Sequence, residues 1–230
     1  MNITRLMQIE CRKMRLERFY KQVLIANIAI VILVLITKFT FSLSNDTEIP
    51  ALSTVSIIDT LVKAVFVVWQ SVMIAYIIVE EFRSKTALLL FSYPIKRGNI
   101  IASKLALIII MTFSAMLITQ VFVNGIVFVL NAVFPFIDYQ ISITDVLQLF
   151  ITSVAAICMG MAPLYIGMLN KSTVTTVVSS IAIVSLTVGS GVGDGARMIN
   201  ILPVSLVLAS VGIGLAYISI KKISIEDTVL

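Results

Sequence analysis

The stretch EEFRSKTALLLFSYPIKR, residues 80–97, separates two long apolar runs of the chain. It begins with two glutamates and ends with a lysine and an arginine, an order that matches the preference of a helix for acidic residues at its start and basic residues at its end. Pro94 would end such a helix before the next apolar run. A passive connector needs only a few polar residues, so this stretch predicts a helix that contacts something.

One side of this predicted helix is largely apolar. Phe82, Thr86, Leu89 and Tyr93 recur at i, i+4, i+7 and i+11, which places them on one helical face. Two interpretations are open. The helix lies flat on the membrane, or it docks in a groove of a cytoplasmic partner protein.

The rest of the chain has the composition of a membrane protein. Hydrophobic residues make up 59% of the 230 residues and charged residues 13%, whereas water-soluble domains are about half apolar and about a quarter charged. A membrane-spanning helix needs about 20 apolar residues. Six runs meet this requirement, at about 23–43, 57–79, 105–131, 146–169, 173–192 and 201–220. The sequence therefore predicts an all-α integral membrane protein with six transmembrane helices.

Basic residues are distributed unequally between the two sides of such a chain. With the N-terminus inside, all but three of the 17 Lys and Arg residues fall on the inner side. The three exceptions are Lys38, Lys63 and Arg197. An excess of basic residues in inner loops predicts that both termini are cytoplasmic.

These runs divide the chain into three parts. We expect residues 1–22 to form a basic amphipathic helix at the membrane surface, residues 23–220 to form the transmembrane domain, and residues 221–230 to form a cytoplasmic tail. The alternative for residues 1–22 is a basic tail that only sets the orientation. Attraction to anionic lipid accounts for their charge, so no nucleic-acid partner is expected.

Four of the amide side chains inside the predicted spans are candidates for a structural or transport role. They are Gln70 in the second span and Gln120, Asn124 and Asn131 near one face of the third, which is predicted to run from about residue 98 to 131. In hydrocarbon, amides bond to groups on neighbouring helices. Two roles are open for them: contacts that hold helices together, which we favour for the third span, and the lining of a translocation path.

Three charged residues lie near the ends of spans. Asp59 and Lys63 are one helical turn apart near the outer end of the second span, so we expect them to pair. A structural pair is favoured over a substrate site. Lys104 follows the start of the third helix, and we expect its ammonium group to extend to the membrane interface.

Proline and small residues predict the shape of the later spans. Pro163 predicts a kink in the fourth span, because proline donates no backbone hydrogen bond. Ala156 and Gly160 in the same span, and Ser210 and Gly214 in the sixth, are predicted to allow close approach of neighbouring helices.

Several kinds of chemistry are not supported by the sequence. It contains no histidine, which excludes Ser-His and Cys-His nucleophilic catalysis and histidine metal sites. It has no nucleotide-binding motif, so we expect no catalytic, metal or cofactor site in this chain. Ion-coupled carriers usually keep a carboxylate near the membrane midplane, and none is evident here. Energy for uphill transport would therefore come from another subunit.

The segment at 80–97 resembles the corresponding segment of the ABC-2 family of transporter permeases. In that family, an acidic residue at the inner end of the second span is followed by Thr, a pair of Leu, Pro and Arg, and then by Lys on the third helix. The matching residues are Glu80 or Glu81, Thr86, Leu88, Leu89, Pro94, Arg97 and Lys104. The six spans, the N-terminal helix and the cytoplasmic termini also resemble the family, although the outer loops are short.

This resemblance implies that the segment is a coupling helix that contacts a soluble ATPase subunit, in which ATP and Mg are bound. The residues implied in this contact are Glu80, Glu81, Phe82, Thr86, Leu88, Leu89, Tyr93, Pro94 and Arg97. Two permeases, identical or paralogous, would assemble with two ATPases. The small size and Ile-rich composition further resemble permeases of Gram-positive peptide exporters in the bacterial cell membrane, such as those for lantibiotics, bacitracin and amphipathic toxin peptides.

The resulting hypothesis is a permease subunit of an exporter for an amphipathic substrate, which is a peptide, an antimicrobial or a lipid-like compound. The alternatives are a secondary carrier, which intramembrane carboxylates and an inverted repeat would favour, and a non-transporting membrane sensor or assembly protein. A sensor would tolerate changes in residues 80–97.

Overall fold

The computed structural model of the protein describes residues 16–43, 54–83, 97–133, 139–170, 172–189 and 201–226. Every regular element within these ranges is helical. The elements are α2 (Leu16–Leu43), α3 (Thr54–Ile74), η1 (Ala75–Val79), α4 (Glu80–Arg83), α6 (Arg97–Asn131), α7 (Ile143–Met159), α8 (Ala162–Asn170), α9 (Thr173–Gly189) and α10 (Ile201–Glu226). The predicted all-α fold is confirmed for this part of the chain.

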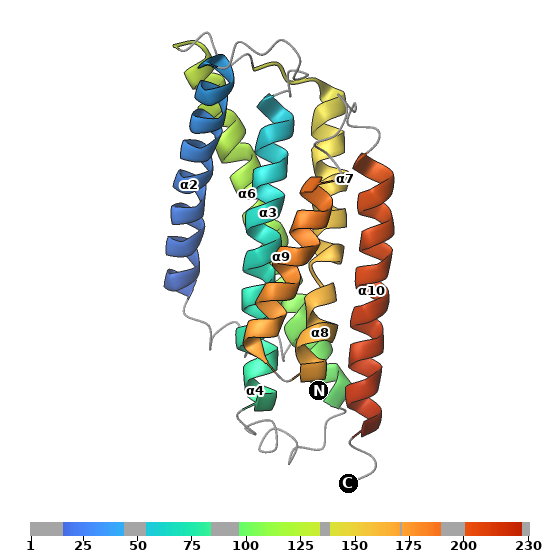
Figure 1. Ribbon diagram of the computed structural model, residues 1–230. Helices are drawn as coiled ribbons and strands as arrows, with labels where there is room; N and C mark the ends of the chain where they lie inside the picture. Colours follow the sequence, from blue (N-terminus) through green and yellow to red (C-terminus); the bar gives the residue numbers. More distant parts are fainter. Residues whose placement is uncertain are drawn as a thin grey trace.

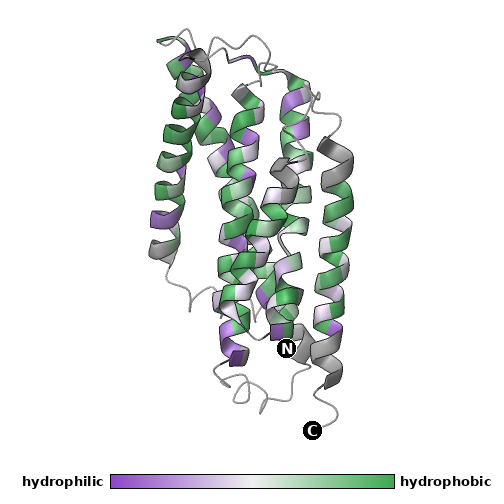
Figure 2. Ribbon diagram, viewed as in Figure 1, coloured by the Kyte–Doolittle hydropathy of each residue, from purple (hydrophilic) through white to green (hydrophobic). Residues whose placement is uncertain are grey.

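The helices run side by side and alternate in direction along the sequence (Figure 1). α3, η1 and α4 form one continuous rod, and α7 and α8 follow each other across a short break. Hydrophobic residues cover the middle of the bundle and hydrophilic residues gather toward its ends (Figure 2). This distribution matches a bundle that sits across a bilayer.

Within the described ranges, four helical stretches are long and apolar enough to cross a membrane. They are Phe19–Thr40, Thr54–Val79, Ile100–Asn131 and Ile143–Asn170. The fifth and sixth apolar runs coincide with α9 and α10, whose described apolar parts, Thr173–Ser185 and Leu206–Lys221, are shorter. The chain is therefore a multi-pass membrane protein, and the count of six spans stays a prediction.

The predicted boundaries differ from the helices at two places. α2 is unbroken from Leu16, so residues 16–22 belong to the same helix as the first predicted span, and the rest of the predicted surface helix lies outside the described residues. α10 extends to Glu226 and thus includes the first part of the predicted tail. The third helix matches its prediction closely, since α6 has 35 residues and is therefore about 50 Å long.

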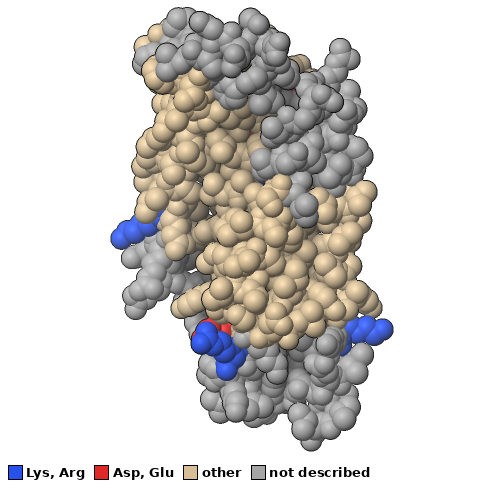
Figure 3. Space-filling model, in the orientation of Figure 1, with Lys and Arg blue, Asp and Glu red and all other residues tan. Residues whose placement is uncertain are grey.

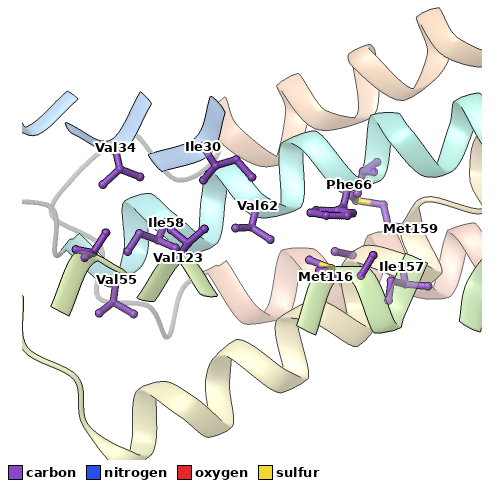
Figure 4. Packing of buried hydrophobic residues seen from close by; sticks show 14 of the residues in the cluster. Ile30, Val34, Val55, Ile58, Val62, Phe66, Met116, Val123, Ile157 and Met159 are labelled. Atoms are coloured by element: carbon purple, nitrogen blue, oxygen red, sulfur yellow. The ribbon is translucent and has the colours of Figure 1, made fainter. Parts of the chain in front are cut away.

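The bundle packs around α3. One buried cluster joins α2, α3, α6 and α7, and it includes Ile30, Ile58, Phe66, Met116 and Ile157 (Figure 4). A second cluster surrounds η1 and includes Ile77, Ile78, Leu105, Ile108 and Leu164. Because lipid is as apolar as these side chains, close packing rather than burial from water holds such helices together.

Within the described part of this chain, no close approach to a neighbouring helix is made at the small residues predicted in the sixth span. Ser210 and Gly214 are both exposed, and a Cβ at Gly214 would meet nothing within 4 Å. The close approach is made by Gly212, where a Cβ would lie 2.3 Å from the carbonyl oxygen of Cys158 in α7. Gly212 lies two residues from each of the predicted positions, which places it on the opposite side of the helix.

Candidate functional site

The first candidate region is the end of the α3 rod that leads into residues 84–96. At η1 the helix widens, and the backbone N–H of Glu80 donates to the carbonyl of Ala75 five residues earlier. Ile77, Ile78 and Val79 are buried there, and η1 contacts α6, α8 and α9. Single π turns within helices often occur at functional sites, so this turn marks the rod as a candidate moving part.

Glu81 forms an ion pair with Lys104 of α6 just beyond the π turn. The Lys104 side chain is only 2% exposed and that of Glu81 is 23% exposed. The prediction that Lys104 extends to the membrane interface is therefore wrong. A carboxylate from α4 reaches the ammonium group inside the bundle, so its charge is balanced by an ion pair instead of by water.

The adjacent glutamate has a different environment. Glu80 lies 3.6 Å from Arg83, and the two side chains are 44% and 62% exposed. Exposed pairs of this kind contribute about 0–1 kcal/mol. On the face shown in Figure 3, the coloured charged atoms lie at the left edge and toward the lower end of the molecule, and the broad tan surface between them shows none. Glu81 thus faces into the bundle, whereas Glu80 lies at its surface.

The remaining predicted coupling residues cannot be placed in space. Thr86, Leu88, Leu89, Tyr93 and Pro94 lie outside the described residues. The backbones of Phe82 and Arg97 belong to α4 and α6, but their side chains are not among those described. The apolar coupling face therefore stays a prediction.

The second candidate region is the break in the fourth membrane helix, where the predicted kink is found. α7 ends at Met159 and α8 begins at Ala162, with Pro163 at its second position. The N–H of Met161 donates to the carbonyl of Cys158 at 3.2 Å, three residues back, instead of to Ile157. The carbonyl of Ile157 is thereby left without the donor that a continuous helix would supply.

Gln70 of α3 supplies the missing donor. Its Nε2 donates to the carbonyl oxygen of Ile157 at 3.1 Å, and its side chain is completely buried. Gly160 makes room for this amide, since a Cβ there would lie 2.4 Å from Gln70 Oε1. Gln70, predicted as a residue of the translocation path, is thus packed against a helix break. The predicted close approach at Gly160 is confirmed, and its neighbour is α3.

A second contact ties α3 to α9 next to Gln70. Ser71 Oγ donates to Ser180 Oγ at 2.8 Å, and both side chains are buried. On the same helix α9, Thr176 packs against Gly167 of α8, where a Cβ would lie 2.0 Å from Thr176 Oγ1. Sequence reasoning missed these residues, because no spacing within the chain indicates which serine of one span faces a serine of another.

The third candidate region is a chain of polar contacts near the start of α3. Lys63 donates to Asp59 Oδ2, which confirms the predicted pair. Gln120 Nε2 donates to Asp59 Oδ1 at 3.2 Å, and Asn124 Nδ2 lies 3.4 Å from Gln120 Oε1. These bonds join α3 to α6.

Tyr139 completes this polar chain. Its hydroxyl donates to Asn124 Oδ1 at 3.0 Å, and its backbone N–H donates to Asn131 Oδ1 at 3.3 Å. Burial, and secondarily the Asp145 carboxylate, raises the pKa of Tyr139 above its usual range, so the hydroxyl remains a donor. Asp145 itself caps α7 by accepting from the N–H of Ser142 at 2.9 Å. Gln120, Asn124 and Asn131 thus bond to protein groups, which supports a structural role over a path lining.

Tyr139 was not predicted as part of this region. Its position eight residues after Asn131, beyond the end of α6, gave no periodic signal. No cluster of three or more Cys, Asp or Glu side chains that could hold a metal occurs in the part of the chain that the structure describes.

Comparison with known proteins identifies the family. The model of the ABC-2 family of transporter proteins matches residues 6–189. An uncharacterized protein of Bacillus subtilis, YcbO, is 29% identical over 230 residues, which cover 96% of this chain and 99% of that protein. No solved structure matches the chain. Because the family model covers well over half of the sequence, the chain belongs to the ABC-2 family of transporter proteins.

Proposed function

We propose that the chain is the permease subunit of an ATP-binding-cassette exporter that moves an amphipathic substrate: a peptide, an antimicrobial or a lipid-like compound. Membership of the ABC-2 family makes the chain a membrane component of an ABC transporter, with the ATPase in a partner protein. The direction of transport, the substrate class and the pairing with a second permease copy or paralogue belong to the proposal.

The observation that carries this proposal is the construction of the α3–η1–α4 rod. It passes through the centre of the bundle and ends where residues 84–96 begin. Its last turn is held against α6 by the buried pair of Glu81 and Lys104. A segment that receives force from a partner needs such an anchor, because a loosely attached loop would move without moving the helices behind it.

The proposed orientation places this end of the rod in the cytoplasm, where a soluble ATPase would meet it. Among the described basic residues, Lys21, Arg83, Lys104 and Lys221 belong to helix ends on the side of α4. This arrangement supports the positive-inside prediction. Both chain ends would then be cytoplasmic as well.

The test is to co-express the chain with a candidate soluble ABC ATPase from the same genome and to measure co-purification. Leu89→Asp places a carboxylate on the predicted docking face, and burial of an unpaired charge is strongly unfavourable. We expect this variant to enter the membrane and to lose the ATPase or its substrate-stimulated ATP turnover. Phe91→Asp is the matched control, since Phe91 lies about half a turn away on the predicted helix.

The control variant is expected to retain the ATPase. If Leu89→Asp also retains it and transports like the parent, residues 80–97 are only a surface connector and the proposal loses its main support. Equal loss in both variants would show that any charge in the segment is disruptive, which contradicts a one-sided docking face.

A further inference from the structure

Gln70 replaces a backbone group at the break in the fourth membrane helix. In a continuous helix the N–H of Met161 would bond to the carbonyl of Ile157. Here that N–H bonds to Cys158 instead, and Nε2 of Gln70 occupies the acceptor at 3.1 Å. The bent arrangement is therefore stabilised by a side chain from another helix, because Gln70 supplies a donor to the carbonyl oxygen that the break leaves without one.

In the described part of the chain, only the nitrogen of the Gln70 amide has a hydrogen-bond partner. Oε1 of Gln70 is buried without a hydrogen-bond partner in the described structure. A buried carbonyl oxygen without a donor is unfavourable, so this arrangement carries a cost that an alternative arrangement could relieve. The opposite side of the break is equally constrained, because Gly212 of α10 packs directly on Cys158 and Met159.

Pro163 sets the balance between the two arrangements. It has no N–H to donate to the carbonyl of Met159, and its ring crowds that carbonyl in a regular helix. The kink is thus favoured by Pro163 from within the helix and by Gln70 from α3. Only the second contribution can change when α3 moves.

Gln70 and the coupling end belong to the same rod. The π turn begins at Ala75, five positions after Gln70, and α4 follows the π turn directly. A displacement that enters through residues 84–96 travels along α3 to the amide, since helices are stiff over such lengths. At the neighbouring position, Ser71 bonds to Ser180 of α9, so withdrawal of Gln70 requires that this bond break or that α9 move with α3.

We propose that Gln70 is a positioning residue that acts as a latch: it holds the fourth membrane helix bent while its amide occupies the carbonyl of Ile157, and withdrawal of α3 lets α7 and α8 straighten. As a step of transport this inference rests on the proposed function, but the latch itself is a property of this chain. It concerns neither ATP nor the substrate.

The test measures the distance between spin labels at Val146 on α7 and Leu169 on α8, both of which are exposed. Cys11 and Cys158 are replaced by alanine in all variants, and labelled copies are diluted with unlabelled ones so that only distances within one chain are read. A straight helix would place the two Cα atoms about 35 Å apart, and a bend shortens this distance.

Four variants are compared in lipid nanodiscs without an ATPase: Gln70→Leu, Pro163→Ala, the double variant and Ser71→Ala. Gln70→Leu is expected to add a longer distance, Pro163→Ala to change the distribution little, and the double variant to give mainly the longer distance. Ser71→Ala, which removes the neighbouring contact but not the latch, should match the parent.

The latch is refuted if the double variant gives the same distribution as Pro163→Ala alone. It is equally refuted if Ser71→Ala lengthens the distance as much as Gln70→Leu, because the effect would then reflect any loosening of α3. Failure of the chain to bind an ATPase would overturn the proposed function and leave these distances unaffected, so the two failures are distinguishable.

Discussion

Replacing Glu81 by glutamine removes the negative charge that faces Lys104 while it keeps the size of the side chain. The ammonium group of Lys104 is almost completely enclosed, with 2% of the side chain exposed. Loss of the carboxylate would remove this negative charge from beside a buried cation. The structure therefore predicts a large loss of stability from a substitution that changes only one charge.

The magnitude follows from the geometry of the pair. Two opposite unit charges about 4 Å apart attract by about 4 kcal/mol at an effective dielectric constant of about 20, and removal of one member of a buried pair costs about 3–5 kcal/mol. Glu81 is 23% exposed, so water reaches one side of the pair and reduces the effect. We expect a loss of about 2–3 kcal/mol, which lowers the melting temperature of a chain of this size by about 5–10 °C.

The assay is thermal denaturation of the purified full chain in detergent, followed by the monodisperse peak in size-exclusion chromatography. Glu80→Gln is the matched control, because the pair of Glu80 with Arg83 is exposed and its loss is worth about 0.5 kcal/mol or less. Adding Lys104→Met to Glu81→Gln should restore most of the stability, since the buried cation is then replaced by an apolar side chain. Equal melting temperatures for Glu80→Gln and Glu81→Gln would refute the buried pair.

Three further predictions address packing, topology and pH. In Gly167→Ala the new Cβ would lie 2.0 Å from Thr176 Oγ1, so this variant should lose about 1–3 kcal/mol of stability. Gly214→Ala has nothing within 4 Å of the new Cβ and should be neutral or slightly stabilising. Equal shifts in melting temperature for the two variants would contradict the packing of α8 on α9. Single cysteines near positions 46, 140 and 194 should react with an impermeant reagent in intact cells, and cysteines near 90 and 226 should not; reaction at 90 would contradict the proposed orientation. Because burial raises the pKa of Tyr139, the parent should lose stability as the pH rises above about 10. Tyr139→Phe should not show this alkaline loss, and it should be less stable than the parent by about 1 kcal/mol at neutral pH. The same dependence of stability on alkaline pH in both proteins would assign the loss to other groups.

The helices could be predicted well because hydropathy in a membrane protein is a strong and local signal. The apolar runs coincide with helices, and Pro163 correctly located the break, since both depend on residues close in sequence. The end of α6 was placed at Asn131, as the structure has it. The Asp59–Lys63 pair was predicted for the same reason, because its members are one turn apart.

Contacts between helices could not be predicted with the same success. Lys104 was expected to reach the membrane interface because it lies near the start of a helix that is longer than the bilayer, yet its partner lies 23 residues away across the connecting segment. Glu81 ends one span and Lys104 follows the start of the next, so a short connection between antiparallel helices could have indicated the pair. No comparable signal links Gln70 to Ile157, 87 residues apart, because that bond depends on the rotation and height of two helices.

The ion pair also changes how a variant at Glu81 must be interpreted. Glu81→Lys would bring two ammonium groups together inside the bundle, so a loss of ATPase binding by that variant would first report damage to the permease. Leu89 lies beyond the pair and is the better probe of docking. The structure thus separates the residue that anchors the rod from the residues predicted to receive the partner.

Three polar contacts lie along a single rod at equal intervals of eleven residues: Asp59 with Lys63 and Gln120, Gln70 with Ile157, and Glu81 with Lys104. The π turn lies between the second and the third. One residue corresponds to about 100° of rotation in an α-helix, so conversion of the π turn to regular helix would rotate Glu81 relative to Gln70 by about that angle and separate it from Lys104. A displacement of residues 84–96 then has one of two effects. It converts the π turn to regular helix, which breaks the Glu81–Lys104 pair, or it moves Gln70 away from Ile157, which lets α7 and α8 straighten. The stability of the Glu81–Lys104 pair favours the second route, since a strong anchor at the coupling end keeps the π turn intact while the whole rod moves.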